Sequence, residues 1–257
     1  MQKLIAILFI GLLAGSTPPN SEKMGFLNWI KTQQVVEHKD LEIKYDLSDS
    51  KSEKLIEVEI GSINLPTGKI IASDPFFTHS IKPFSRTVRP GDYPVYLYIT
   101  EVEPNHYRIA FAKIKFDVNP STYWTLAVTD DMKIEDLKNL QEGEFFGFPV
   151  DAGLGCFIDE KTNLKYIEKI DNFYNANPEN NYYTDLLAFE FDKYSSKNQY
   201  SREGGDWNNH IVDSETNSNV IMFASGWGDG YYPTYWGHND NKEIVELTID
   251  FMIDFDE

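Results

Sequence analysis

The sequence has little cysteine, few basic residues and no apolar run long enough to cross a membrane. One cysteine in 257 residues excludes an intrachain disulfide framework and a cysteine-rich zinc site. The 41 Asp and Glu residues outnumber the 23 Lys and Arg residues, which gives a formal charge of −18 at pH 7. A general nucleic-acid binder normally presents a basic face, so we expect no nucleic-acid partner.

The common signatures of cofactor and metal sites are also missing. The chain contains no P-loop, no G-x-G-x-x-G, no EF-hand spacing and no His-x-x-x-His pair. Each of these patterns supplies the backbone amides or the ligand geometry that a phosphate or a metal requires. We therefore expect a protein without a cofactor and without a metal.

The N-terminus carries the strongest local signal. A short positive start, Met1–Lys3, precedes eleven consecutive apolar residues from Leu4 to Ala14, and Gly15–Asn20 then breaks any helix. Eleven residues are too few for a bilayer span, which needs about 20. The pattern is typical of a cleaved export signal. We expect residues 1–16 to be removed, and the mature chain, without a transmembrane span, to reach the periplasm, the cell envelope or the medium.

The end of this signal leaves one alternative open. The stretch Leu13-Ala14-Gly15-Ser16 resembles a bacterial lipoprotein signal, except that Ser16 stands where the lipidated cysteine is required. A serine hydroxyl cannot form the thioether, so we expect a lipid anchor only if Ser16 replaces a native cysteine.

Alternating apolar residues dominate the rest of the chain, and 41% of all residues are hydrophobic. We expect the α+β class, with one β-rich domain over residues 51–257, mostly antiparallel sheets and a few helices grouped mid-chain. Residues 17–50 would form an N-terminal linker with a short helix over 24–38. Strands are predicted at 41–45, 55–65, 69–73, 93–102, 107–116, 123–128, 220–225, 231–237 and 243–251, helices at 133–140, 160–175 and 182–196, and a polar loop at 197–209.

The glycine-rich segment Asp151–Cys156 is the first candidate site. It precedes the predicted helix that Asp159 can cap, and glycines before a helix N-terminus can hold an anion on free N–H groups. The competing interpretation is a tight turn at which two backbones approach closely.

Cys156 is the only thiol and a candidate nucleophile, because a helix N-terminus lowers a thiol pKa. His210 or His238 could supply the base, with Asp151 or Asp206 as the group that orients it. The alternative is that Cys156 is a small buried apolar residue, the usual role of a lone cysteine.

The densest group of candidate side chains lies near the C-terminus, around Gly226-Trp227-Gly228-Asp229-Gly230. Aromatic faces beside a carboxylate could bind a sugar or another flat ligand. The alternative is a glycine-dense β-turn whose aromatic residues pack against a sheet. The full set of binding candidates is Asp151, Cys156, Asp206, Trp207, His210, Trp227, Asp229, Trp236 and His238.

The two glycine-rich segments, 151–156 and 226–230, are expected to lie close together in the fold. Glycine-dense turns commonly mark places where backbones approach each other. We expect Asp229 to accept hydrogen bonds from backbone N–H groups of its own or a neighbouring turn. A carboxylate with a binding function would instead face solvent in a cleft beside Trp227 or Trp236.

Four blocks, taken in order, resemble a family of bacterial and plant proteins known as domain of unknown function 4241. The blocks are 65–68 through 74–75, 90–95, 150–157 with 159, and 226–230 with 232–233 and 236–237; 250–251 also fit. The resemblance covers about residues 55–255 and implies one domain. It implies no activity and no catalytic residue.

The first functional hypothesis is an exported, non-catalytic binding protein whose partner is a sugar, a peptide or a basic protein. Neutralisation of a basic toxin, an immunity-type role, is one version, because acidic charge would speed that encounter. The second is a hydrolase that uses Cys156 with a histidine, or an Asp/His set formed by Asp206, His210 and Asp229. The third is a structural component of the envelope without a small ligand.

Overall fold

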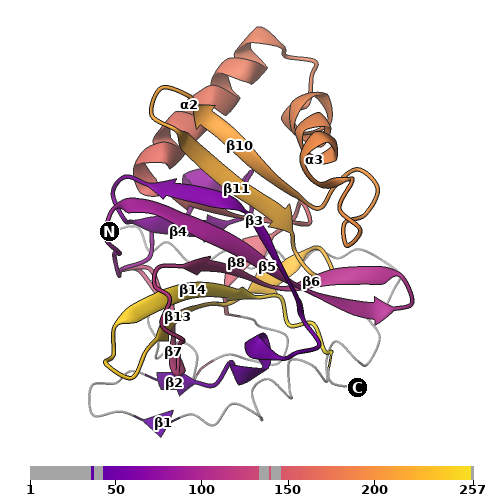
Figure 1. Ribbon diagram of the computed structural model, residues 1–257. Coiled ribbons are helices and arrows are strands. Elements are labelled where there is room, and N and C mark those ends of the chain that lie inside the picture. The colour runs from indigo at the N-terminus through magenta and orange to yellow at the C-terminus, as the bar shows by residue number, and fades with distance from the viewer. Residues whose placement is uncertain (1–35, 38–42, 133–138, 140–145, 256–257) are drawn as a thin grey trace.

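The computed structural model describes residues 36–37, 43–132, 139 and 146–255, which form three stacked layers (Figure 1). An eight-stranded sheet is one layer and a four-stranded sheet is the middle layer. Two helices cover the outer face of the four-stranded sheet. Every strand pair described is antiparallel, which confirms the predicted α+β class.

The large sheet has the strand order β1-β2-β7-β13-β14-β6-β5-β3. Its two longest neighbours form the hairpin expected at 93–116, and the hairpin tip projects at one end of the molecule (Figure 1). The strands are β1 Val36–Glu37, β2 Ile43–Tyr45, β3 Ile56–Leu65, β5 Gly91–Glu103, β6 His106–Lys115, β7 Tyr123–Leu126, β13 Thr234–His238 and β14 Ile244–Asp250.

The middle sheet has the order β10-β11-β9-β4, and a separate two-stranded sheet pairs β12 with β8. Helix α2 begins after Asp159, whose side chain accepts the N–H of Lys161 at 2.8 Å, as the capping signal predicted. The elements are β4 Ile70–Ser73, β8 Phe148–Val150, β9 Leu154–Asp159, α2 Glu160–Ala176, a π-helical turn Tyr183–Leu187, α3 Ala188–Ser195, β10 Trp207–Asp213, β11 Ser218–Ala224 and β12 Gly230–Tyr232.

Strand β9 is covered on both faces, and all six of its residues are buried. Phe157 packs into the core between the two sheets. Cys156 and Ile158 point the other way, into the core between the middle sheet and the helices. The domain therefore has two apolar cores that share this strand.

Several predicted boundaries are wrong. Segment 154–159 is a strand rather than a turn running into a helix, and β10 begins within the predicted loop 197–209. Both strands lack apolar alternation, so only their packing partners identify them. Strand β2 joins the large sheet through β7, so the domain begins before residue 51, and 36–37 are strand rather than helix. The rest of the predicted helix 24–38 and most of 133–140 lie outside the described residues.

Two buried carboxylates fasten loops at the two ends of the middle sheet. Asp159 accepts the backbone N–H and the hydroxyl of Thr67, at 3.0 and 2.8 Å. Asp74 accepts the backbone N–H groups of Asp151 and Ala152, at 3.0 and 2.8 Å. A buried carboxylate is tolerated where such bonds replace its lost hydration.

The outer face of the large sheet contains a buried polar network. Glu246 accepts the indole N–H of Trp124 at 2.7 Å, and its carboxylate lies 3.6 Å from the Lys113 ammonium. Gly237 separates Glu246 from Trp124 in the ladder. A Cβ at Gly237 would lie 2.4 Å from Cγ of Glu246, so only glycine leaves the side chain a path across the strand. This geometry explains the glycine of the Trp236-Gly237 block.

Asp250, buried at the end of β14, should make the stability of the protein depend on pH. Burial, with a smaller contribution from the nearby Asp49 carboxylate, raises the pKa of Asp250 to about 6. The unfolded chain ionises this group near pH 4, so its contribution to stability falls as the pH rises from about 4 to about 6. We expect Asp250→Asn to raise the unfolding free energy by about 2–3 kcal/mol at pH 7.5 and by almost nothing at pH 4. Urea denaturation across this range measures the difference.

The matched control is Asp46→Asn. Asp46 is exposed and accepts the N–H of Ser48 two residues ahead at 2.9 Å, as Asp250 accepts that of Met252 at 2.7 Å. The control should leave the shape of the pH profile unchanged. A gain for Asp250→Asn that is equal at pH 4 and pH 7.5 would contradict the prediction.

Candidate functional site

Cys156 does not stand at a helix N-terminus. It lies inside β9, opposite Met222 on one side and Ser73 on the other, and is fully buried. Burial raises the pKa of the thiol well above its usual value, and the Asp74 carboxylate adds to the shift. Among the described residues no hydrogen bond joins Cys156 to a histidine. The surroundings therefore favour the neutral thiol rather than the nucleophilic thiolate.

His210 lies beneath the helices and is buried. Its Nδ1 lies 2.8 Å from the Glu190 carboxylate, and its Nε2 lies 3.1 Å from the Tyr182 hydroxyl. A carboxylate, an imidazole and a hydroxyl in this order form the chain that activates a nucleophile in many hydrolases. Here the hydroxyl is that of a buried tyrosine whose pKa is raised by burial, so it is a poor nucleophile. The sequence indicates His210 as a candidate but not its partners, because Glu190 and Tyr182 lie in a different predicted element, the helix at 182–196.

Asp206 and Trp207 have structural partners of their own. Both oxygens of Asp206 are taken up by Arg202, through the guanidinium at 2.7 and 2.6 Å and the backbone N–H at 2.8 Å. Trp207 is buried in the core between the sheets. Asp206, His210 and Asp229 therefore each bind different partners, and no hydrogen bond or ion pair among the described residues joins them into one set.

Trp236 and His238, from the same strand, are also buried. Trp236 packs edge-on against Phe84 with ring centroids 5.9 Å apart. His238 stacks on Tyr123 at 4.8 Å, and its Nε2 lies 2.9 Å from the hydroxyl of Thr125. Burial lowers the pKa of His238 to about 4, so the ring is neutral at pH 7. These two residues belong to the sheet rather than to a binding site.

The two glycine-rich segments meet, as predicted. The Asp229 carboxylate accepts the N–H of Gly153 at 3.1 Å, and the N–H of Ser225 donates to the Gly153 carbonyl at 3.1 Å. The loop is also tied to itself, because the hydroxyls of Ser225 and Tyr232 both donate to the Gly228 carbonyl at 2.8 Å. Asp229 thus makes the expected backbone bond, although its side chain is exposed. Asp151, also exposed, lies on the adjoining turn.

This braced loop presents Trp227, whose side chain is 53% exposed. The Arg108 guanidinium lies 5.1 Å from the centre of the Trp227 ring, and the His106 ring stands edge-on at 6.2 Å. Both come from β6, next to the hairpin tip. Arg202 and Arg108 line one small hollow with Gly226 from the same loop. We call Trp227, Asp229, His106, Arg108 and Arg202 the Trp227 surface.

Sequence analysis predicted Trp227 and Asp229 but missed the three basic residues of the Trp227 surface. They stand in two other segments, at 106–108 and 202, and no local pattern relates a hairpin tip to a distant turn. Only the folded structure shows that a cation lies over an exposed aromatic ring when the two residues are far apart in the chain.

The chain belongs to the family described as protein of unknown function DUF4241, whose model matches residues 63–249. This confirms the resemblance derived from the four blocks. No curated protein and no solved structure matches the chain. Within the described residues, no group of three or more His, Cys, Asp and Glu side chains is arranged to hold a metal ion. No helix in the same part of the chain combines the length and apolarity of a membrane span.

Most residues in the matching blocks have a role in holding the fold. Thr67 binds the helix cap Asp159, and Asp74 binds the turn at 151–152. Gly155 leaves room for Phe223, because a Cβ there would lie 2.9 Å from the Phe223 ring. These residues of the blocks specify the architecture, whereas the large side chain of Trp227 in the last block is exposed.

Cys156 should be unreactive in the native protein. With the thiol fully buried and its pKa raised, we expect no reaction with a thiol reagent such as 5,5′-dithiobis(2-nitrobenzoate) on the timescale of minutes. In 8 M urea one thiol per chain should react. Absorbance of the released thiolate measures both. Rapid stoichiometric labelling of the folded protein would contradict this assignment and favour the nucleophile hypothesis.

Proposed function

We propose that this is an exported, non-catalytic binding protein and that it binds its ligand at the Trp227 surface. The observation that carries the proposal is Trp227, a large aromatic side chain kept 53% exposed on a loop tied down by four hydrogen bonds. Because the loop is held in place, little conformational entropy is lost when a ligand contacts this tryptophan. Tryptophan and arginine are also enriched among the interface residues that contribute most of the binding energy.

The local charge favours a sugar or a peptide over a basic protein as the ligand. The chain as a whole carries −18, yet the Arg108 guanidinium lies 5.1 Å from the centre of the Trp227 ring. A basic partner, as in the immunity-type version, would meet this cation at the centre of its contact. A ligand with a flat or apolar face, by contrast, can stack on the indole ring.

The hydrolase alternative has less support. Cys156 is buried with a raised pKa, and Asp206, His210 and His238 are buried and engaged by other residues. Catalysis needs a nucleophile and a base that meet where a substrate can reach them. The groups best suited to that chemistry lie inside the domain, whereas the exposed groups suit binding.

Export should be visible as a defined loss of mass. We expect the protein isolated from its own host to lack residues 1–16 and to carry no diacylglycerol, because Ser16 cannot form the thioether. Intact-mass spectrometry measures both properties. A chain that retains Met1, or a lipid increment on the mature N-terminus, would contradict this part of the proposal.

Removal of the Trp227 side chain should abolish ligand binding with little loss of stability. We expect Trp227→Ala to weaken binding by about tenfold or more, because exposed tryptophans at interface centres typically contribute about 2 kcal/mol or more. Wild-type protein and variant are compared on one array of oligosaccharides and peptides.

The control is Phe189→Ala, which removes another exposed aromatic side chain, 71% exposed, from helix α3. It should bind as the wild type does. Ligands that bind the wild type and Trp227→Ala equally well would exclude the Trp227 surface as the binding site.

A further inference from the structure

Arg108 is a partly buried cation without a matching anion. Its Nε is buried and has no hydrogen-bond partner, and its Nη1 reaches only the carbonyl of Tyr107, at 3.5 Å. Among the described residues no carboxylate forms a salt bridge with Arg108. A buried charge is ordinarily paired, because its desolvation otherwise costs several kcal/mol.

The carboxylates in the neighbourhood are all engaged elsewhere. Asp206 uses both oxygens for Arg202. Asp229 accepts the N–H of Gly153, and Glu103 lies 3.5 Å from Nδ1 of His106. Within the described part of the chain, the Tyr107 carbonyl is therefore the one hydrogen-bond acceptor that Arg108 reaches, and its Nε has none.

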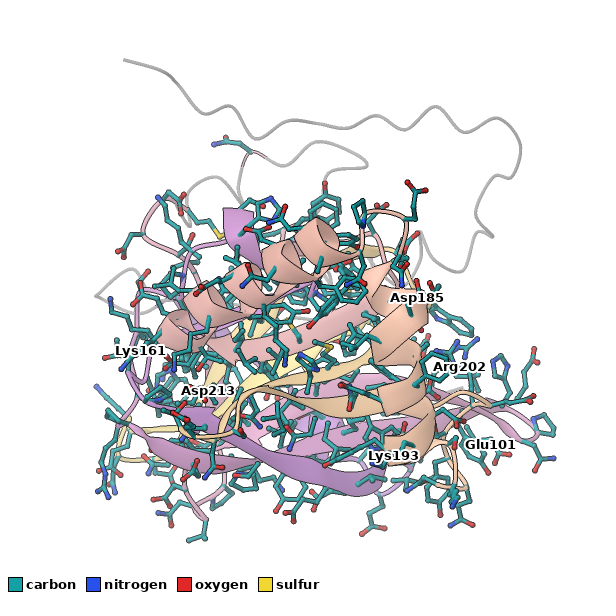
Figure 2. All side chains as sticks on the ribbon, turned by 90° about the horizontal axis from the view of Figure 1, so that it is seen from above. Glu101, Lys161, Asp185, Lys193, Arg202 and Asp213 are labelled. Carbon is teal, nitrogen blue, oxygen red and sulfur yellow. The ribbon has the colours of Figure 1, made fainter. Side chains whose placement is uncertain are left out.

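A second cation, Arg202, lies near Arg108. Burial lowers the pKa of Arg108, and the charge of Arg202 lowers it further, whereas the Asp206 carboxylate acts in the opposite direction. Arg108 and Arg202 line one hollow of about 10 Å³ together with Tyr107, Tyr200 and Asp206, the carboxylate that pairs with Arg202. That volume has room for about one water-sized group. Figure 2 shows Arg202 at the same end of the molecule as Glu101 of the hairpin.

We infer that Arg108, with Arg202 beside it, is an anion subsite of the Trp227 surface and binds a carboxylate, sulfate or phosphate group of the ligand. One oxygen of the anion fits the hollow between the two guanidinium groups, and Nε and Nη of Arg108 form the fork that such oxygens accept. The body of the ligand then rests on the exposed ring of Trp227, beside which Arg108 is held. This inference rests on the proposed function and narrows the ligand to an acidic sugar or an acidic peptide.

The Nε–Hε resonance of Arg108 reports the subsite directly. The resonance is assigned by its loss from the ¹H–¹⁵N spectrum of Arg108→Gln. Wild-type protein is titrated with sodium acetate and, separately, with sodium sulfate and sodium phosphate, each at an ionic strength held constant with sodium chloride. We expect a saturable shift of this resonance and of the Trp227 indole. If acetate binds more tightly than the other two anions, the ligand group is identified as a carboxylate. If sulfate or phosphate binds more tightly, the group is identified as a tetrahedral anion.

Two variants test the assignment. Arg89→Gln removes an exposed arginine at the opposite end of β5 and should leave the titration unchanged. Arg108→Lys keeps the charge but loses the fork, so the Trp227 indole should respond with about tenfold weaker affinity or not at all. If Arg108→Gln does not fold, the loss of the same resonance from the spectrum of Arg108→Lys assigns it.

The outcomes are separable from those of the proposed function. Shifts that stay linear with anion concentration, or an indole response that persists in Arg108→Gln, would overturn the anion subsite. If the array nevertheless finds a ligand that depends on Trp227, the proposed function stands without the subsite. If anions bind at Arg108 and no array ligand depends on Trp227, the subsite stands and the proposed function fails.

Discussion

The burial of β9 on both faces is the constraint from which the rest of the architecture follows. A strand with Phe157 on one face and Cys156 and Ile158 on the other needs a packed layer on each side. The large sheet supplies one layer and the helices supply the other (Figure 1). Because such a strand offers no exposed side chain to tolerate a shift, its register is fixed, and the carboxylates of Asp74 and Asp159 hold the loops at its two ends.

That constraint also decides where chemistry is possible. The thiol and the histidines that would attract attention in the sequence, Cys156, His210 and His238, lie on strands and point into packed layers. Glu190 and Tyr182 engage both ring nitrogens of His210, and Thr125 engages Nε2 of His238. The exposed candidate residues, Trp227 and Asp229, lie instead at the end of the molecule where the glycine turn at 226–230 contacts the β5–β6 hairpin.

The Trp227 surface shows how a rigid sheet supports an exposed aromatic side chain. The hydrogen bond between Asp229 and Gly153 joins the loop to the turn before β9, so a fully buried strand helps to position the loop that carries the indole ring. Arg108 lies over that ring from the large sheet. Arg108 thus places a cation beside the exposed tryptophan of a chain whose formal charge is −18.

The amino-acid sequence alone predicts the α+β class, most strands of the large sheet, both described helices, the cap at Asp159 and the meeting of the two glycine-rich segments. These features depend on local periodicity, capping chemistry and glycine conformation, which act over a few residues. The folded structure was needed to show that segment 154–159 is a strand, that Arg108 lies against Trp227 and that Arg202 lines a hollow with Arg108. Those outcomes depend on contacts between segments far apart in the chain, which no short pattern encodes.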